Sequence, residues 1–358
     1  MTEDKSKYEL TIDFVMILGK YFEENKDFIN VMKVCKKYKE LVEMYHFNPI
    51  SDISLFKQIE TQHFYKKEDV INKKDKLFQY IYWFGVNYDK IISSKKNNEI
   101  YKDVIFNKEC LKSEDIKNNN FIVPEGITRI GNKCFNNYSI LTNIQLPSNL
   151  KELGSNSFEK TNITTITIPE SVTKFGYGCF NKCTQLTNVQ LPPNLKELSL
   201  ALLSQTNIKS IIIPEGVTKI NEMSFLLCTQ LSYVQLPSTL KEIQGNVFSK
   251  TKITTIRIPE GVTRIGHWCF CDCLQLKNII LPSSLIEIGH NALSNTSITF
   301  IKIPQNVNKI GESCFNFCNK LNLIELYNPD LLILDKFIAE HFKLYKDEVN
   351  YKFYKLKK

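Results

Sequence analysis

The sequence predicts an α+β repeat protein, a solenoid of about nine to ten coils of 22 or 23 residues with helical caps at both ends. Two observations predict this fold. An apolar residue followed by proline recurs at intervals that alternate between 23 and 22 residues, so the full period is 45 residues. A coil of this size cannot bury its own apolar face, so it must stack on its neighbours. The prolines are Pro124, Pro147, Pro169, Pro192, Pro214, Pro237, Pro259, Pro282 and Pro304.

A short strand is predicted immediately before each proline. Segments such as 164–168 and 187–191 alternate apolar and polar residues and are rich in threonine, isoleucine and valine, which is typical of a half-buried strand. Proline then ends the strand because it has no N–H group to donate to a sheet. The outward positions of these strands form columns of side chains along the solenoid.

A turn and an aromatic anchor are predicted after each strand. Six coils carry a glycine that is suited to a turn with positive φ: Gly131, Gly154, Gly176, Gly266, Gly289 and Gly311. Four residues later most coils have a phenylalanine that we expect to be buried: Phe135, Phe158, Phe180, Phe225, Phe248, Phe270 and Phe315. Leu203 and Leu293 take this position in two coils.

Eleven cysteines are present, an odd number that predicts mostly reduced thiols. One column alternates threonine and cysteine in successive coils: Thr161, Cys183, Thr206, Cys228, Thr251, Cys273, Thr296 and Cys318. Successive cysteines of this column are two coils apart, roughly 9–10 Å at strand spacing, which is too far for a disulfide. We therefore expect small, buried thiols.

No metal, cofactor or catalytic site is predicted. His267, Cys269, Cys271 and Cys273 are a possible zinc set, but the repeat already explains Cys269 and Cys273 as core residues. The five histidines lie in no nucleophile–base pattern, and the sequence has no motif of the hydrolase, phosphate-binding or metalloprotease types. We expect a protein that is not an enzyme and that needs no cofactor.

Composition and charge favour a folded chain. The 358 residues are 43% hydrophobic and 23% charged, which is enough for a large core. The sequence contains no run of 18 apolar residues and no apolar run after its charged start, so we expect no transmembrane helix and no secretory signal. The net charge of +8 is spread along the chain, which gives no indication of a nucleic-acid partner.

The pattern LxxIxLPxxLxxIgxxxFxxCxxL, over residues 121–328, resembles the BspA-like leucine-rich repeat family. The resemblance implies a leucine-rich-repeat solenoid. It also implies an adhesin at the surface of bacteria or of some protozoa. Protozoan members carry an N-terminal helical segment that ends in a stretch like the HFNPI of residues 46–50.

Four segments are predicted. Residues 1–50 form a helical segment, in which DFINVMKVCKKYKEL resembles the second half of an F-box with Tyr38 in place of the usual tryptophan; the alternative is a plain helical cap. Residues 51–120 are a connector and N-terminal cap that becomes the first irregular coils. Residues 121–328 are the solenoid, and residues 329–358 are a C-terminal capping helix with a basic tail.

A ladder of alternating charge lies five residues after the prolines. The sign changes without exception along Arg129, Glu152, Lys174, Glu197, Lys219, Glu242, Arg264, Glu287 and Lys309. Opposite signs on neighbouring coils favour the correct stacking, whereas a slip of one coil places like charges together. We therefore predict a role in the register of the coils.

The strand face of the later coils is the predicted binding site for a protein partner. Apolar, aromatic and basic residues meet there, and we expect contacts from Tyr233, Arg257, Ile280, Phe300, Lys302 and Leu323. An open alternative is that the C-terminal helix covers Phe300 and Leu323. Three functions remain: a cytoplasmic, non-enzymatic interaction scaffold, which we favour; an F-box-like substrate adaptor of a ubiquitin ligase; and a cell-surface adhesin that binds host or matrix protein and reaches the surface by a signal-independent route.

Overall fold

A computed structural model describes residues 12–34, 38, 41–56, 59–71, 79–94, 98–112, 119–327, 331, 340–346 and 351–355. The chain divides into two compact units, residues 1–105 and residues 106–358. Among the described residues, no helix has the length and hydropathy that crossing a bilayer requires.

The first unit begins with short helices around an aromatic core. Helices α1 (Ile12–Leu18) and α2 (Asn25–Val34) are followed by a 3-10 turn, Leu41–Met44. The ring of Phe28 is fully buried and packs edge to face on Tyr45 and Phe56, at centroid distances of 5.8 and 5.2 Å. The core therefore rests on aromatic packing, and Tyr38 is buried in it.

The first unit continues with parallel strands. Strands β1 (Thr61–Phe64), β2 (Gln79–Tyr82) and β4 (Glu99–Tyr101) pair in parallel, and β3 (Val86–Asn87) pairs with β5 (Val104–Phe106). Helix α3 (Tyr88–Ser94) follows β3 directly. The rings of Phe64, Tyr82 and Tyr101 stack at 4.7 and 4.8 Å. These parallel strands recur at steps of 18 and 19 residues, which are shorter than those of the predicted solenoid.

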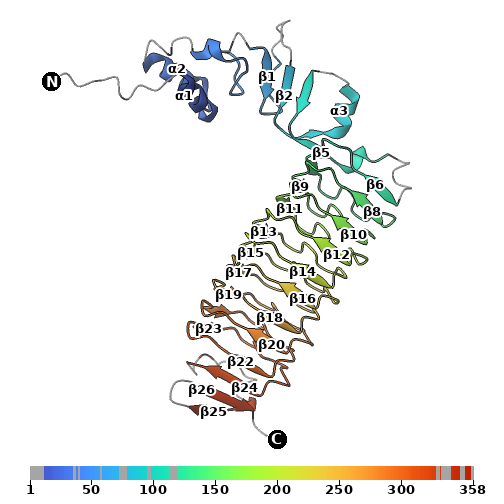
Figure 1. Cartoon of the computed structure of the whole chain (residues 1–358), viewed down its shortest axis with the longest axis vertical. Helices are drawn as coiled ribbons and strands as arrows, with labels where there is room; N and C mark the ends of the chain where they lie inside the picture. Colours follow the sequence, from blue (N-terminus) through green and yellow to red (C-terminus); the bar gives the residue numbers. More distant parts are fainter. Residues whose placement is uncertain are drawn as a thin grey trace, which may run out of the picture. The chain divides into compact units, whose positions relative to one another are not determined.

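The second unit is a β-solenoid built on two ladders of parallel strands, which run side by side along it (Figure 1). The first ladder consists of the strands before the prolines: β6 (Asn120–Ile122), β8 (Asn143–Gln145), β10 (Thr165–Thr167), β12 (Asn188–Gln190), β14 (Ser210–Ile212), β16 (Tyr233–Gln235), β18 (Thr255–Arg257), β20 (Asn278–Ile280), β22 (Phe300–Lys302) and β24 (Leu323–Leu326). The second ladder consists of β7 (Arg129–Ile130), β9 (Glu152–Leu153), β11 (Lys174–Phe175), β13 (Glu197–Leu198), β15 (Lys219–Ile220), β17 (Glu242–Ile243), β19 (Arg264–Ile265), β21 (Glu287–Ile288) and β23 (Lys309–Ile310). The predicted solenoid fold is confirmed.

The two ladders differ in continuity. In the first ladder the strands pair two by two, as in β10 with β12 and β18 with β20. Each such pair is separated by 23 residues, for example Thr165 and Asn188, whereas unpaired neighbours are separated by 22 residues. In the second ladder β13 to β23 form one continuous six-stranded sheet.

The predicted aromatic anchors form the core. Phe135, Phe158 and Phe180 stack with centroid distances of 5.2 and 5.4 Å, and Phe225, Phe248 and Phe270 repeat this stack at 5.5 and 5.4 Å. All six rings are at most 1% exposed. The N–H of each anchor donates to a carbonyl of the next coil, as Phe270 does to Ala292 at 2.8 Å. Burial and backbone hydrogen bonds therefore repeat together.

The predicted role of the six repeated glycines in positive-φ turns is wrong. The residues with positive φ flank the anchor on both sides instead, as Trp268 and Asp272 flank Phe270 with φ of 53° and 58°. The glycines are required by close approach between coils. A Cβ on Gly154 would lie 2.7 Å from the backbone of Gly131, and one on Gly289 would lie 2.6 Å from the backbone nitrogen of His267.

The cysteine columns are buried as predicted. The ten described cysteines are free thiols. Cys183 Sγ donates to the carbonyl of Phe158 at 3.0 Å, and the Thr161 hydroxyl donates to the same carbonyl at 2.9 Å. Burial raises the pKa of the Cys183 thiol to about 11 and that of Cys273 to about 11, so both side chains stay protonated donors at neutral pH.

The C-terminal capping helix is a correction. Strands β25 (Phe342–Lys346) and β26 (Tyr351–Lys355) form an antiparallel hairpin, and β26 pairs with β24. Both segments are rich in aromatic residues, which favour strands. The hairpin satisfies the free backbone groups at the edge of β24, which a helix would leave unpaired. The predicted helical positions Leu332, Phe337 and Ile338 lie outside the described residues.

Candidate functional site

The outward side chains of the first ladder form one surface, which we call the strand face. The pleat of each strand alternates the side chains, so that in β10 Thr165 and Thr167 are exposed while Ile166 is buried. The residues that the sequence analysis placed in outward columns therefore lie at the surface in this strand.

The N-terminal half of the strand face, on β6, β8, β10 and β12, carries no charge on its described strand residues. Its outward side chains are Asn120, Ile122, Asn143, Gln145, Thr165, Thr167, Asn188 and Gln190. Asn143 Nδ2 donates to Asn120 Oδ1 at 2.7 Å, so amides pair with one another across neighbouring strands. Apart from Ile122, which is 69% exposed, this half is a polar, uncharged surface.

The C-terminal half, on β14 to β24, is more apolar and carries charge. Its outward side chains are Ser210, Ile212, Tyr233, Gln235, Thr255, Arg257, Asn278, Ile280, Phe300, Lys302, Leu323 and Glu325. Four large apolar or aromatic side chains among them are substantially exposed: Ile212 (61%), Tyr233 (55%), Phe300 (43%) and Ile280 (42%). No ion pair within the described part of the chain engages Arg257 or Lys302.

Five of the six predicted partner-binding residues lie exposed on this half: Tyr233, Arg257, Ile280, Phe300 and Lys302. Leu323 is half-buried and faces Tyr354 of β26 in the register of the terminal hairpin. The hairpin extends the sheet at its edge (Figure 1), and Phe300 keeps its exposure.

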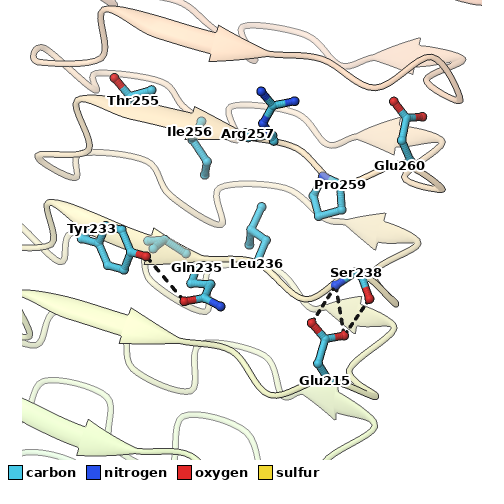
Figure 2. A pocket seen from close by; sticks show the side chains of 11 residues that line it. Glu215, Tyr233, Gln235, Leu236, Ser238, Thr255, Ile256, Arg257, Pro259 and Glu260 are labelled. Carbon is cyan, nitrogen blue, oxygen red and sulfur yellow. Dashed lines mark hydrogen bonds between the residues drawn. The ribbon is translucent and has the colours of Figure 1, made fainter.

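A groove opens between β16 and β18, where the first ladder is not paired (Figure 2). We call it groove A. Its volume is about 560 Å³, and it is lined by Glu215, Tyr233, Val234, Gln235, Leu236, Ser238, Thr255, Ile256, Arg257, Pro259 and Glu260. Val234 and Leu236 are half-buried, so these inward side chains are partly exposed to solvent in the groove.

Two carboxylates lie at the proline end of groove A (Figure 2). Glu215 accepts hydrogen bonds from the N–H of Ser238 at 3.1 Å and from its hydroxyl at 2.9 Å, and these bonds lower the pKa of Glu215. Glu260 accepts the same pair of bonds from Ser283, at 3.2 and 2.9 Å, and its pKa is lowered for the same reason. Both carboxylates connect neighbouring coils while they remain charged.

A second groove, groove B, lies between β20 and β22. Its volume is about 450 Å³, and it is lined by Ile279, Ile280, Leu281, Ser283, Phe300, Lys302, Pro304, Gln305 and Tyr327. Most of these positions follow those of groove A by the 45-residue period, so that Phe300 corresponds to Thr255 and Lys302 to Arg257. The same unpaired step of the ladder therefore produces both grooves.

The grooves bring in residues that the sequence analysis missed. Leu236 and Leu281 occupy inward strand positions, yet both are half-buried, whereas the equivalent Leu146 and Leu191 are 9% and 5% exposed. Tyr327 joins groove B from the end of β24. The alternation of 23- and 22-residue intervals was the sequence signal that could have located the grooves, because each groove lies between two strands that are 22 residues apart.

The charge ladder occupies the first residue of each short strand in the second ladder. Neighbouring charges face each other in register, as in Lys219 with Glu242 and Glu242 with Arg264. The ion pairs that join the ladder include Lys174–Glu152 at 3.1 Å, Lys219–Glu242 at 3.3 Å, Arg264–Glu287 at 3.4 Å and Lys309–Glu287 at 2.9 Å. The ladder is interrupted between Lys174 and Glu197, because β11 and β13 belong to different sheets.

The possible zinc residues do not converge. No group of three or more His, Cys, Asp or Glu side chains that could hold a metal ion occurs in the described ranges. His267 Nδ1 accepts the N–H of His290 at 2.9 Å, and Cys273 Sγ donates to the carbonyl of Phe248 at 3.0 Å. Cys269 is fully buried, and Cys271 is half-buried with a pKa that burial raises to about 11.

The repeat identifies the family. Residues 104–225 and 200–322 match the BspA type leucine rich repeat region, in six copies. These ranges span more than half of the chain, so the chain belongs to the BspA-type leucine-rich repeat family. Leucine-rich repeat proteins are generally scaffolds for protein interaction or adhesion.

Three solved structures are similar to this chain over part of its length. A leucine-rich repeat protein from Bacteroides ovatus is 22% identical with a TM-score of 0.45, over 69% of this chain and 81% of that protein. A leucine rich cell surface protein from Faecalibacterium prausnitzii is 20% identical with a TM-score of 0.38, over 66% and 75%. The pneumococcal vaccine antigen PcpA is 20% identical with a TM-score of 0.41, over 57% and 61%. No curated protein sequence matches the chain.

Proposed function

We propose that the chain is a non-enzymatic scaffold that binds a protein partner through the C-terminal half of the strand face. One observation carries the proposal: exposed Tyr233, Ile280 and Phe300 cluster with Arg257 and Lys302 around grooves A and B. Aromatic and apolar side chains with arginine are enriched at the centres of protein interfaces. Extended surfaces of this kind are what solenoids offer to partners.

The chemistry of the described side chains supports a role without catalysis. The thiols of the Thr/Cys column are buried donors to carbonyl groups. The Nδ1 atoms of His267 and His290 accept backbone N–H bonds from His290 and Glu312, which leaves them unavailable as bases. These contacts favour structural roles for the nucleophilic and basic groups.

The test is affinity capture from cells that express the protein, followed by mass spectrometry and a binding assay with the captured partner. The wild type is compared with the double variant Tyr233→Ala, Arg257→Ala and with a control in the N-terminal half, Asn143→Ala, Thr165→Ala, Asn188→Ala. The proposal expects the double variant to lose the partner and the control to retain it. Loss by the control alone would move the site to the N-terminal half.

We propose a cytoplasmic location for this scaffold. The ten described cysteines are free, and at least four of their thiols act as protonated donors, which suits a reducing compartment. Fractionation and surface labelling of intact cells test this proposal. Surface labelling, or glycans on the sequons at Asn137, Asn162 and Asn295, would instead support the adhesin.

An F-box-like adaptor is the second candidate. The observation that favours it is the hydrophobic cluster of Phe28, Tyr45 and Phe56, in which Tyr38 is also buried; Tyr38 replaces the F-box tryptophan in the sequence resemblance. Pulldown of the full chain with the linker subunit of a ubiquitin ligase tests it. Binding that disappears with Tyr38→Ala while the solenoid melts normally would support the adaptor, and absence of binding would reject it.

A further inference from the structure

Grooves A and B differ in charge although the repeat makes them equivalent. Groove A has three charged lining residues, Glu215, Arg257 and Glu260. The lining of groove B has one, Lys302, and Gln305 stands where groove A has Glu260. The counterpart of Glu215 is Glu260, which accepts hydrogen bonds from the lining residue Ser283 and so lies at the edge of groove B. Groove B therefore has one carboxylate fewer than groove A.

The ammonium group of Lys302 is not neutralised by an ion pair within the described part of the protein. Its register partner is Glu325 on β24, but the Glu325 carboxylate lies 3.9 Å from Lys352 Nζ. No ion pair that the described residues form engages Lys302. The ammonium group is exposed and available to an anion.

The remaining lining of groove B is largely apolar. Ile280 and Phe300 face solvent at 42% and 43% exposure, and Leu281 and Tyr327 are half-buried. Covering this surface removes apolar area from water, which is favourable in proportion to the area. A volume of about 450 Å³ lies within the range of about 300–1,000 Å³ that is typical of ligand pockets.

We propose that groove B binds an extended, acidic–apolar segment of a protein partner. A carboxylate of the segment pairs with Lys302, and a neighbouring aliphatic or aromatic side chain packs on Ile280 and Phe300. The inference rests on the proposed function and adds the chemistry of the partner. Charge complementarity selects the carboxylate, and the apolar lining selects its neighbour.

Groove A provides the internal comparison. Its Glu260 repels a carboxylate at the position where groove B presents the neutral Gln305, whereas its Glu215 has a counterpart beside groove B in the Glu260 that bonds Ser283. The substitution Gln305→Glu introduces into groove B the charge that groove A carries at this position. A control is Gln190→Glu, which adds the same charge to an outward strand position in the uncharged N-terminal half of the strand face.

The experiment selects peptides from a displayed library of random octapeptides on the full chain and measures the affinities of the winners by fluorescence anisotropy. The expected winners contain aspartate or glutamate beside a large apolar residue. We expect Lys302→Gln to weaken them about threefold and Lys302→Glu about tenfold, because exposed charge pairs contribute modestly. Gln305→Glu is also expected to weaken them, and Gln190→Glu should leave them unchanged.

Several outcomes would overturn the inference. Selection of basic or neutral peptides, no selection at all, or winners indifferent to Lys302→Glu each contradict it. A ten-nucleotide single-stranded RNA that displaces the winners with higher affinity would assign the cations to nucleic acid instead. If the Lys302 variants leave the affinity of the selected peptides unchanged but Ile280→Ser and Phe300→Ser abolish binding, this inference fails and the proposed function stands. If none of these substitutions changes the affinity, both the inference and the proposed function are contradicted.

Discussion

The N-terminal and C-terminal halves of the strand face share one core and present different surfaces. The core under the N-terminal half contains the stacked rings of Phe135, Phe158 and Phe180, and the core under the C-terminal half contains those of Phe225, Phe248 and Phe270. In both stacks the distance between neighbouring ring centroids lies between 5.2 and 5.5 Å. Outside, amides and hydroxyls give way to Tyr233, Ile280 and Phe300. The difference teaches that stacking constrains the inward positions, while the outward positions are free to acquire a binding surface.

Removal of an aromatic anchor has the largest expected effect, and it should not distinguish the halves. Phe158 and Phe270 are both 0% exposed. We expect Phe158→Ala and Phe270→Ala each to lower the free energy of unfolding by about 3–5 kcal/mol, since each leaves a cavity in a packed column. Chemical denaturation measures both. A Phe270→Ala variant that melts with the wild type would contradict the shared core.

Loss of partner binding is the next largest effect, and it should separate the halves. We expect Tyr233→Ala with Arg257→Ala to weaken the partner at least about tenfold, or about 1.4 kcal/mol, because both side chains line groove A. The unfolding transition should stay in place because both residues are exposed. Titration calorimetry of the partner, beside the Asn143, Thr165 and Asn188 control, checks the comparison; equal weakening by both variants would remove the distinction.

Reversal of a ladder charge should have a smaller effect that depends on its position and on salt. Glu242 lies between Lys219 and Arg264 in a continuous sheet, whereas Glu197 begins the sheet after the break. We expect Glu242→Lys to cost at most about 1 kcal/mol per exposed pair at low salt and less at high salt. Glu197→Lys should cost less than Glu242→Lys. Thermal melts at two salt concentrations decide this, and a salt-independent loss would reject the role in register.

Acidification should affect the C-terminal half first, and this is the smallest expected effect. Burial, followed by the neighbouring His290 and Arg264, lowers the pKa of His267 below its usual 6.5. As pH falls through about 6.5 the unfolded chain binds its proton first, so stability is lost from there down to the folded pKa. Protonation would also remove the bond that Nδ1 accepts from the N–H of His290.

Hydrogen exchange by mass spectrometry at pH 7 and pH 5 measures the difference between the halves. Coils around His267 and His290 should exchange faster at pH 5 than coils 129–190, which contain no histidine. His267→Gln should abolish the difference. Equal acceleration in both halves would assign the pH dependence to other groups.

The sequence by itself predicted the main inward and outward positions that the 45-residue period repeats. The strands before the prolines, the buried anchors such as Phe270, the Thr/Cys column and the facing signs of the charge ladder follow from spacing, because each coil must bury the same face against its neighbour. The outward positions, including Tyr233 and Arg257, followed from the period-2 pattern of the same strands.

Only the tertiary structure decided what depends on how neighbouring coils meet. The role of Gly154 in close backbone approach, the pairing of strands only at 23-residue steps, and the resulting grooves A and B require the distances between coils. The terminal hairpin likewise depends on the free edge of β24, with which β26 pairs. Sequence periodicity specifies which side of a coil is buried, whereas backbone pairing between coils determines where the surface opens.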